Sequence, residues 1–248
     1  MDKKTVEKLK NLNKQFYKVQ AKSFSDTRQV HWPGWEKLMD EFVDKFVDSK
    51  KDGLRILDIG CGNGRFLKWL IQNKIDKGEY MGVDFSEELI NRAREGMENT
   101  KTKMKIDFEN FDVMQPGSLK GKFSELFDRI IIFGVMHHVP GFENRLRFLK
   151  EAVSLLEKNG RIYLTLWQFS KSSRLKKLII RHELEGLEEG DFLLDWDKSG
   201  LPRYCHNFSD EEVEQLKSEL QKMGLKVVNE YNADGKEGNL NRYLILSL

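Results

Sequence analysis

The sequence predicts an α/β fold with a mostly parallel sheet that helices cover on both faces. From Leu54 onward, short apolar runs alternate with segments of helical periodicity, which is typical of parallel strands joined by crossover helices. Several of these runs end at an acidic residue or a glycine, where a strand leaves a sheet. Two later runs, about 226–232 and 242–248, flank a glycine-rich turn and predict a closing antiparallel hairpin.

The first 53 residues predict a helical extension. Residues 2–22 carry apolar side chains at helical spacing, together with lysines 3, 4, 8, 10, 14, 18 and 22. Residues 23–33 lack a clean period and predict a loop. A second helix follows, with one apolar stripe that we expect in the core: Trp35, Leu38, Met39, Phe42, Val43, Phe46 and Val47.

The remaining chain, 54–248, predicts the main domain. Its first part alternates as strand 55–59, helix 64–73, strand 79–84, helix 87–97, strand 105–109, strand 128–133, helix 143–156 and strand 161–166. Asn159-Gly160 predicts a turn before the last of these strands. Residues 172–208 break the rhythm with a basic helix and an acidic stretch, which we interpret as an inserted lid. Ser209 and Glu212 form a capping-box pattern for a helix that ends at Gly224.

Composition limits the classes of protein to consider. The net charge of +2 gives no global signal for a nucleic-acid partner, although lysines crowd the first helix and basic residues gather at 171–181. Such clusters either follow a phosphate backbone or are solvated helix faces. Two cysteines, Cys61 and Cys205, predict neither a disulfide framework nor a metal site. With no signal peptide and no apolar run long enough to span a bilayer, we expect a cytoplasmic protein without membrane contact.

The stretch Arg55–Phe66 is the strongest functional signal. A short apolar strand containing Asp58 runs into glycines 60, 62 and 64, and helical periodicity resumes at once. Glycines there let the backbone turn tightly and approach a ligand closely. The spacing differs from the dinucleotide fingerprint, and an acid two residues before Gly60 suits the ammonium of an amino-acid moiety better than a pyrophosphate.

Further acids follow at the ends of later apolar runs. Asp84, which Phe85 follows, suits the two hydroxyls of a ribose, and Asp112 with Val113 suits an adenine amine and its flat faces. The run that begins at Asp128 leads into Gly134.

Together these stretches, from about Leu54 to Trp167, resemble the class I S-adenosylmethionine-dependent methyltransferases. The resemblance implies a Rossmann-like fold, a mostly parallel seven-stranded sheet and S-adenosyl-L-methionine as the cofactor. The cofactor-binding residues that we predict are Asp58, Gly60, Cys61, Gly62, Asp84, Phe85, Asp112, Val113 and Gly134.

Shorter motifs narrow the resemblance. Phe24 to Pro33, the pair His137-His138, the stretch 191–196 and the stretch 203–208 resemble, in order, motifs of the tRNA wobble-uridine carboxymethyl methyltransferases. Departures include Cys205 where that family has tyrosine, and a shorter insertion before residue 191. The resemblance implies methyl transfer to the carboxylate of 5-carboxymethyluridine in the tRNA anticodon loop. Eukaryotic members of that family use a small zinc-containing activator subunit, so such a partner is possible here.

A carboxylate acceptor fits the residues in these motifs, because it is ionised at pH 7 and needs no general base. It needs alignment and cationic partners. Arginines would clamp the carboxylate, histidines would donate hydrogen bonds, and an aromatic side chain, Tyr204 or Trp32, would stack on an unpaired base. The catalytic residues that we predict are therefore Arg28, His137, Arg203, Tyr204 and His206.

Several alternatives stay open at this point. Arg28 serves either the acceptor or the methionine carboxylate of the cofactor, and we expect one of His137 and His138 to be a packing residue. The acceptor is either tRNA or a small carboxylic acid or other metabolite. A non-catalytic RNA- or partner-binding module is the hypothesis from another class.

Overall fold

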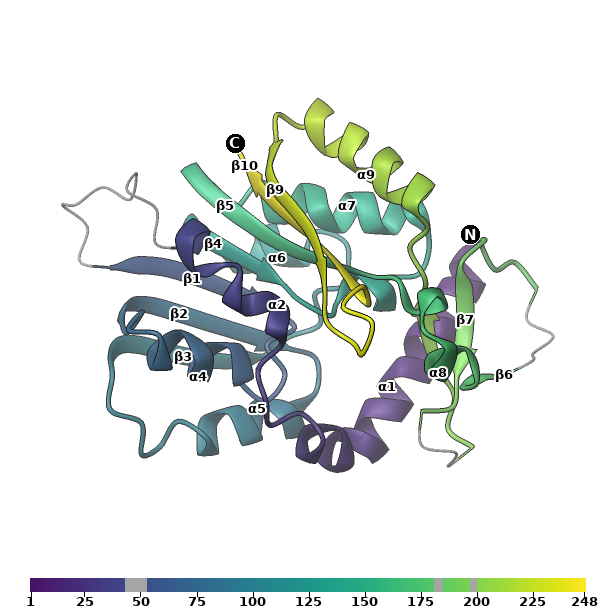
Figure 1. The fold of residues 1–248 in the computed structure, drawn as a ribbon, viewed down its shortest axis with the longest axis horizontal. Coiled ribbons are helices and arrows are strands. Elements are labelled where there is room, and N and C mark those ends of the chain that lie inside the picture. Colours follow the sequence, from purple (N-terminus) through teal and green to yellow (C-terminus); the bar gives the residue numbers. More distant parts are fainter. Residues whose placement is uncertain (43–52, 181–184, 197–199) are drawn as a thin grey trace.

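The structure is a computed structural model, and it describes residues 1–42, 53–180, 185–196 and 200–248. A seven-stranded sheet with the order β3-β2-β1-β4-β5-β10-β9 forms its centre (Figure 1). Strands β1 to β5 are parallel, and β10 and β9 add antiparallel neighbours at one edge, which confirms the predicted fold class. The strands are β1 (Leu54–Ile59), β2 (Lys77–Asp84), β3 (Lys103–Asn110), β4 (Phe127–Ile132), β5 (Leu156–Trp167), β9 (Lys226–Ala233) and β10 (Asn241–Ser247).

Helices pack on both faces of this sheet because successive strand residues point to opposite faces. In β4, Ile130 and Ile132 belong to the core that faces α6, α7 and α9, and Ile131 belongs to the core that faces α4 and α5. The covering helices are α4 (Arg65–Gln72), α5 (Glu87–Glu95), α6 (Ser118–Lys122), α7 (Phe142–Val153) and α9 (Asp210–Lys222).

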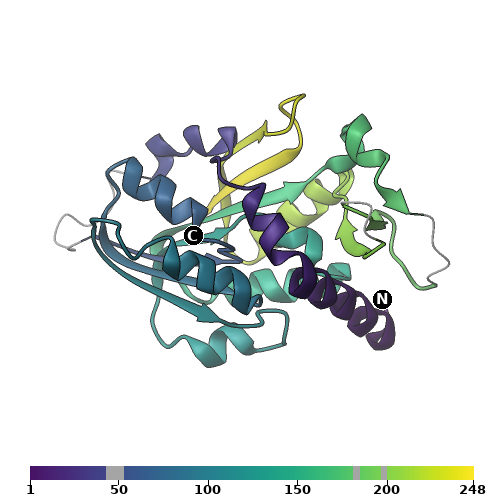
Figure 2. The same cartoon turned by 90° about the horizontal axis from the view of Figure 1, so that it is seen from below.

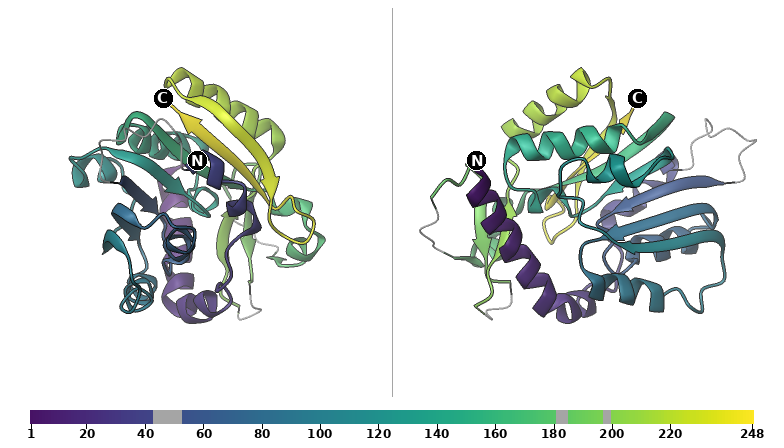
Figure 3. Two further views of the ribbon diagram at one scale, coloured as in Figure 1. Left: turned by 60° about the vertical axis from the view of Figure 1, so that its left-hand side comes forward. Right: turned by 180° about the vertical axis from the view of Figure 1, so that it is seen from behind.

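The N-terminal helix α1 (Lys3–Asp26) is longer than the sequence predicted. The expected loop from Ser23 begins only at Thr27, because the Thr27 N–H still donates to the Ser23 carbonyl at 3.3 Å. Phe24 and Ser25 are therefore helical. Figure 3 shows α1 lying outside the sheet, and its N-terminal part lies beside a second, smaller sheet in Figure 2.

The second predicted helix is two short ones, α2 (Pro33–Glu36) and α3 (Met39–Phe42). Trp35, Leu38 and Phe42 are buried in the core as expected. The expected core positions 43, 46 and 47 lie outside the described residues.

The insertion contains a basic helix, as predicted, but that helix is only four residues long, and a small sheet that the sequence did not predict makes up much of the rest. A 3-10 turn η2 (Phe169–Lys171) and a four-residue α8 (Ser173–Lys176) lead into an antiparallel sheet with the order β6-β7-β8. Its strands are β6 (Ile179–Ile180), β7 (Asp191–Leu194) and β8 (Arg203–His206). Strands this short carry too few residues to show a period of two, which is why the sequence did not reveal them. β8 packs against α1.

Around Asn159 the structure again departs from the prediction. Helix α7 ends at Val153, and β5 already begins at Leu156. Asn159-Gly160 is not a turn before the strand but an irregularity within it. Asn159 adopts φ 68°, and the β4–β5 register shifts between Phe127 and Arg129. Asparagine tolerates this left-handed conformation better than most residues.

The C-terminal hairpin of β9 and β10 is confirmed. In α9 the Ser209 hydroxyl accepts the Glu212 N–H at 3.1 Å, as the capping pattern predicted. In the described part of the chain, no helix is both long and apolar enough to cross a membrane.

Candidate cofactor and acceptor site

A cavity of about 140 Å³ lies where the carboxyl ends of β1, β2 and β4 meet α1. In parallel sheets, ligands bind at this edge. All nine residues that we predicted to bind the cofactor line the cavity. Arg28 lines it too, whereas His137, Arg203, Tyr204 and His206 do not.

Two glycines of the β1–α4 loop have different physical roles. Gly60 adopts φ 76°, and a Cβ there would lie 2.3 Å from Val135 Cγ2, so packing demands glycine. Gly62 adopts φ 55°, and a Cβ there would meet no atom within 4 Å. Since Gly62 lines the cavity, its bare backbone leaves room for a ligand.

Asp58 is buried at the base of the cavity. The Tyr80 hydroxyl donates to its Oδ2. Burial raises the pKa of Asp58 to about 7, although the bond from Tyr80 lowers it. A buried carboxylate that ionises this reluctantly gains strongly from a cationic ligand such as an ammonium.

Asp84 fixes the loop that follows β1. Its Oδ2 accepts the Gly62 N–H at 3.0 Å, and its Oδ1 accepts the Ser86 N–H at 2.9 Å. Burial raises the pKa of Asp84 to about 6, and these two bonds limit the rise. Each oxygen keeps a lone pair that a ribose hydroxyl can use.

Asp112 lines the cavity and forms an ion pair with a lysine of α1. Its Oδ1 accepts the Met114 N–H at 3.0 Å, and its Oδ2 lies 2.9 Å from Lys14 Nζ. The ion pair with Lys14 was not expected from the sequence.

Arg28 follows the end of α1 and faces the cavity. Its guanidinium donates to the Phe24 carbonyl and to Thr27 Oγ1, and its Cζ lies 3.5 Å from the centre of the Phe24 ring. Burial, together with the nearby Arg203 guanidinium, lowers the pKa of Arg28 to about 9.

Arg203 lies behind Tyr17 and is 2% exposed. It donates to the Tyr17 hydroxyl at 3.3 Å, and its buried Nε lacks a hydrogen-bond partner in the described part of the chain. Burial alone would lower the pKa of Arg203, but Cys205 and Tyr17 raise it, so the side chain stays charged. Among the described residues, neither Arg203 nor Arg28 has a carboxylate within 4.0 Å.

His137 lies near Arg203, and its buried Nδ1 is also without a partner among the described residues. Burial and the neighbouring His138 and Arg203 hold the pKa of His137 well below its ordinary value. Trp167 lies 4.6 Å from the His137 ring, and the Arg203 Cζ lies 5.6 Å from the Trp167 ring and 4.9 Å from the Trp196 ring. We call Trp167, Trp196, His137 and Arg203 the tryptophan box.

His138 has a packing role, since both its ring nitrogens are engaged. Nδ1 lies 3.2 Å from Asn13 Nδ2 and from the Tyr204 carbonyl, and Nε2 lies 3.0 Å from the Tyr17 hydroxyl. Of the two rings only that of His137 keeps a nitrogen without a partner among the described residues, yet it is His138 that lines the cavity. Both rings belong to the short turn η1 (Met136–His138) that follows β4.

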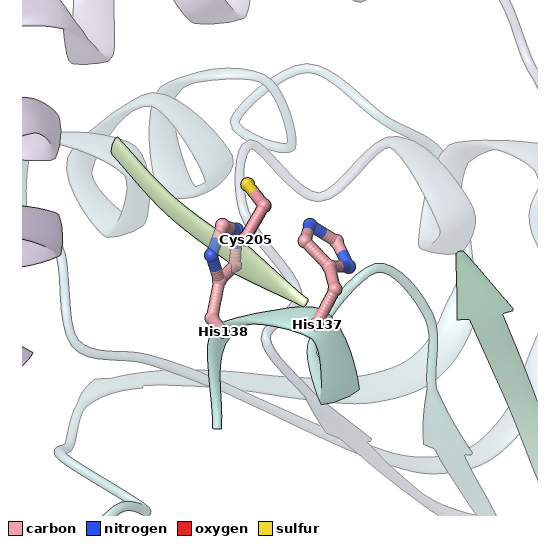
Figure 4. Close-up of side chains that lie close together, drawn as sticks. All are labelled: His137, His138 and Cys205. Carbon is pink, nitrogen blue, oxygen red and sulfur yellow. The ribbon is translucent and has the colours of Figure 1, made fainter. Parts of the chain in front are cut away.

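Figure 4 shows Cys205 above these two rings. The nearest donor atoms of His137, His138 and Cys205 lie within 4.8 Å of one another, and such donors suit soft metal ions. However, burial raises the pKa of the Cys205 thiol to about 11, and Arg203 adds a positive charge beside it. We therefore assign no metal to this group.

Tyr204 and His206 point to the other face of β8 because strand residues alternate. The Tyr204 hydroxyl donates to Asp191 Oδ1 at 2.8 Å, and His206 lies between Asp191 at 2.7 Å and Glu212 at 2.6 Å. Both are fully buried, so neither is placed to contact a base in this structure. These contacts tie the small sheet to α9.

Sequence reasoning missed four residues of the site: Tyr17, Tyr80, Lys14 and Trp196. Tyr17 and Tyr80 sat within apolar patterns that predicted only core, and nothing marked their hydroxyls. Trp196 stood in a motif that we matched to the family, which was a usable signal.

Comparisons with known proteins show what this chain is similar to. A family model described as a methyltransferase domain matches residues 29–230. The probable tRNA methyltransferase 9B of Mus musculus is 26% identical over 200 residues, covering 80% of this chain and 36% of that protein. The tRNA (carboxymethyluridine(34)-5-O)-methyltransferase alkbh8 of Xenopus tropicalis is 29% identical over 159 residues, covering 63% of this chain and 21% of that protein. This chain thus spans about a third or less of these relatives.

Solved structures share the fold. Magnesium protoporphyrin IX methyltransferase from Synechocystis, with bound SAH, gives a TM-score of 0.62 at 18% identity, covering 96% of this chain and 98% of that one. A SAM-dependent methyltransferase from Methanosarcina mazei gives 0.59 at 20% identity, covering 87% and 97%.

Proposed function

Because the chain belongs to the methyltransferase domain family, whose model matches residues 29–230, we propose that it is an S-adenosylmethionine-dependent O-methyltransferase. Its acceptor is the carboxylate of 5-carboxymethyluridine at the wobble position of tRNA.

The cavity suits the cofactor on three counts. Asp58 meets an ammonium, Asp84 meets ribose hydroxyls, and Gly62 leaves a face without a side chain. When bound, S-adenosylmethionine would supply a methyl group to the acceptor carboxylate oxygen: the bond from sulfur to the methyl carbon breaks, S-adenosylhomocysteine leaves, and an ester forms with no proton to remove.

The observation that carries the proposal is the pair of unpartnered nitrogen atoms in the tryptophan box. Arg203 Nε and His137 Nδ1 are buried and bond to nothing in the described part of the chain. Buried polar groups are normally hydrogen-bonded, so these atoms indicate a ligand. The charged guanidinium favours an anion. The unpartnered His137 nitrogen accepts or donates according to the tautomer, which suits the polar edge of a base.

The charge of the site also matches two carboxylates, one on the cofactor and one on the acceptor. Arg28 lines the cavity and Arg203 lies behind Tyr17, so we assign the cofactor carboxylate to Arg28 and the acceptor carboxylate to Arg203. The tryptophan rings supply flat surfaces against which an unpaired base stacks. The names of two relatives support this acceptor: one is a probable tRNA methyltransferase, and the other is a tRNA carboxymethyluridine methyltransferase.

A small carboxylic acid is the second candidate acceptor. The observation that favours it is the depth of Arg203, which is 2% exposed behind Tyr17. A small molecule reaches such a group more readily than a nucleotide within RNA, for which Tyr17 or Trp196 has to move. A non-catalytic module is disfavoured, because the acids and glycines of the cavity are all in place.

The test is nucleoside mass analysis of tRNA bearing 5-carboxymethyluridine after incubation with the protein and S-adenosylmethionine. We expect that nucleoside to gain the mass of one methyl group, and the same tRNA with unmodified uridine to gain none. The sample is run with and without a small activator subunit of the kind that the resembled family uses. Cofactor binding without methyl gain in both samples would contradict the tRNA proposal and favour the small acid.

A further inference from the structure

Helix α1 has two different faces. Leu9, Phe16, Tyr17 and Ala21 are buried on one side of it, and Tyr17 lines the cavity. The other side is basic, since the helix contains seven lysines against two acids, Glu7 and Asp26.

Lys14, Lys18 and Lys22 are exposed and stand on successive turns of α1. Residues four apart lie on one side of a helix, with a rise of about 6 Å between them. The three ammonium groups therefore form a row, which we call the lysine row.

The charges of the row are largely uncompensated. Lys14 pairs with Asp112, but Lys18 and Lys22 have no carboxylate within 4.0 Å among the described residues. Asp26, the nearest acid further along the helix, is 3.5 Å from Arg92 of α5. A solvated helix face usually mixes both signs; here three lysines follow one another before the next acid, and that acid, Asp26, pairs with Arg92.

The position of the row relates it to the cavity. Asp112 lines the cavity, so its 2.9 Å ion pair with Lys14 puts one end of the row at the rim. On the buried side of the same helix, the Tyr17 hydroxyl contacts both Arg203 and His138. A polyanion lying along the row would reach the entrance of the site.

We propose that the lysine row binds the phosphate backbone of the RNA whose nucleotide enters the site. This inference rests on the proposed function and adds the surface that holds the substrate. Lysines neutralise phosphates and release counterions, which gives affinity without reading sequence. A membrane surface is a poorer fit, because the apolar side of α1 is already buried against the protein.

The test variant is Lys18→Gln/Lys22→Gln, which leaves Lys14 and Asp112 untouched. The matched control is Lys150→Gln/Lys158→Gln. It removes two exposed lysines, one from the last turn of α7 and one from the first part of β5, and neither lines the cavity. Affinity for tRNA is measured over a range of salt concentrations, and KM, kcat and the cofactor Kd are measured alongside.

Affinity for RNA falls as salt rises, and we expect this fall to be shallower in the test variant. The magnitude of the slope of log affinity against log salt should decrease by about 1.5, since each lost phosphate contact removes roughly 0.7–0.9. KM for tRNA should rise while kcat and the cofactor Kd stay unchanged. The control should keep the wild-type slope. An unchanged slope in the test variant, an equal loss in the control, or binding to anionic lipid vesicles but not to RNA would overturn the inference.

Failure of the inference is distinguishable from failure of the proposed function. If tRNA gains a methyl group but the salt slope of the test variant is unchanged, the lysine row does not bind RNA and the proposed function stands. If the salt slope depends on Lys18 and Lys22 but tRNA gains no methyl group, the lysine row binds RNA and the proposed function is wrong.

Discussion

Arg28 and Arg203 stand against the same ring: their guanidinium carbons lie 5.1 and 4.9 Å from the centre of Trp196. The two positive charges are near each other, and among the described residues neither has a carboxylate beside it. Such a site binds anions favourably. The two arginines differ in that only Arg28 also lines the cavity, so we assign them different ligands.

Arg203→Ala should leave cofactor affinity unchanged and lower methyl transfer ten-fold or more, because it removes a charged positioning contact of ~2 kcal/mol. Arg28→Ala should instead weaken cofactor binding, since Arg28 lines the cavity. Calorimetric titration with S-adenosylmethionine and single-turnover transfer measure the two effects. Equal loss of cofactor binding in Arg203→Ala would refute the acceptor role. Arg203→Lys keeps the charge without the planar fork and should recover only part of the rate.

Cofactor affinity should depend on pH through Asp58. Only the ionised carboxylate attracts the ammonium, and the pKa of Asp58 is raised to about 7. Affinity should therefore be constant above this pKa and fall up to about tenfold for each pH unit below it. Tyr80→Phe removes a bond that lowers this pKa, so the midpoint should move to higher pH.

Titration calorimetry across pH gives both midpoints. Asp58→Asn, which has no charge to lose, should remove the transition near pH 7 and leave weak binding at every pH. A transition that survives in Asp58→Asn would assign it to another group, with Asp84 as the candidate because its pKa is raised to about 6.

Asp84→Asn should weaken cofactor binding about tenfold to a hundredfold. The amide oxygen still accepts one N–H, but the amide nitrogen then faces the N–H of Gly62 or Ser86, donor against donor. The loss of affinity comes from the ribose hydroxyls, which lose their hydrogen bonds to a charged carboxylate, each worth about 1.5–3 kcal/mol. Equilibrium dialysis with labelled cofactor measures the loss, and circular dichroism checks that the fold persists. If this variant binds the cofactor as tightly as wild type, Asp84 does not contribute to cofactor binding.

His206→Gln should lower stability without changing cofactor affinity. Burial alone would lower the pKa of His206, but Asp191 and Glu212 raise it, so the folded state favours the charged form. That contribution is fully present below the ordinary pKa of about 6.5 and is lost as pH rises through the raised value. The free-energy difference between wild type and variant should be about 1–3 kcal/mol at pH 6 and shrink at alkaline pH.

Chemical denaturation at several pH values checks this, with methyl transfer measured on the folded variant. A constant free-energy difference would contradict the charged state of His206. A large fall in kcat at full stability would instead support the catalytic role that we predicted from sequence.

The residues that the sequence assigned to the cofactor line one cavity, because they follow one another at consecutive strand ends. Asp58, Asp84 and Asp112 each close or follow a strand, and parallel strands bring those ends to one edge. The residues that the sequence assigned to the acceptor do not all lie together. Motif matching marked residues 203–206 as a block, whereas strand alternation turns Arg203 toward the tryptophan box and Tyr204 toward Asp191.

The sequence by itself thus determined the central sheet and the glycine loop, since both depend on local patterns of apolar residues and glycines. Only the tertiary structure decided how α1 and the small sheet close the site. It brought Lys14 to Asp112, Tyr17 to Arg203 and Arg28 to Trp196. These contacts join residues 98, 186 and 168 positions apart, counted from their sequence numbers. Local sequence patterns do not predict these contacts, because the contacts depend on how separate helices and strands pack.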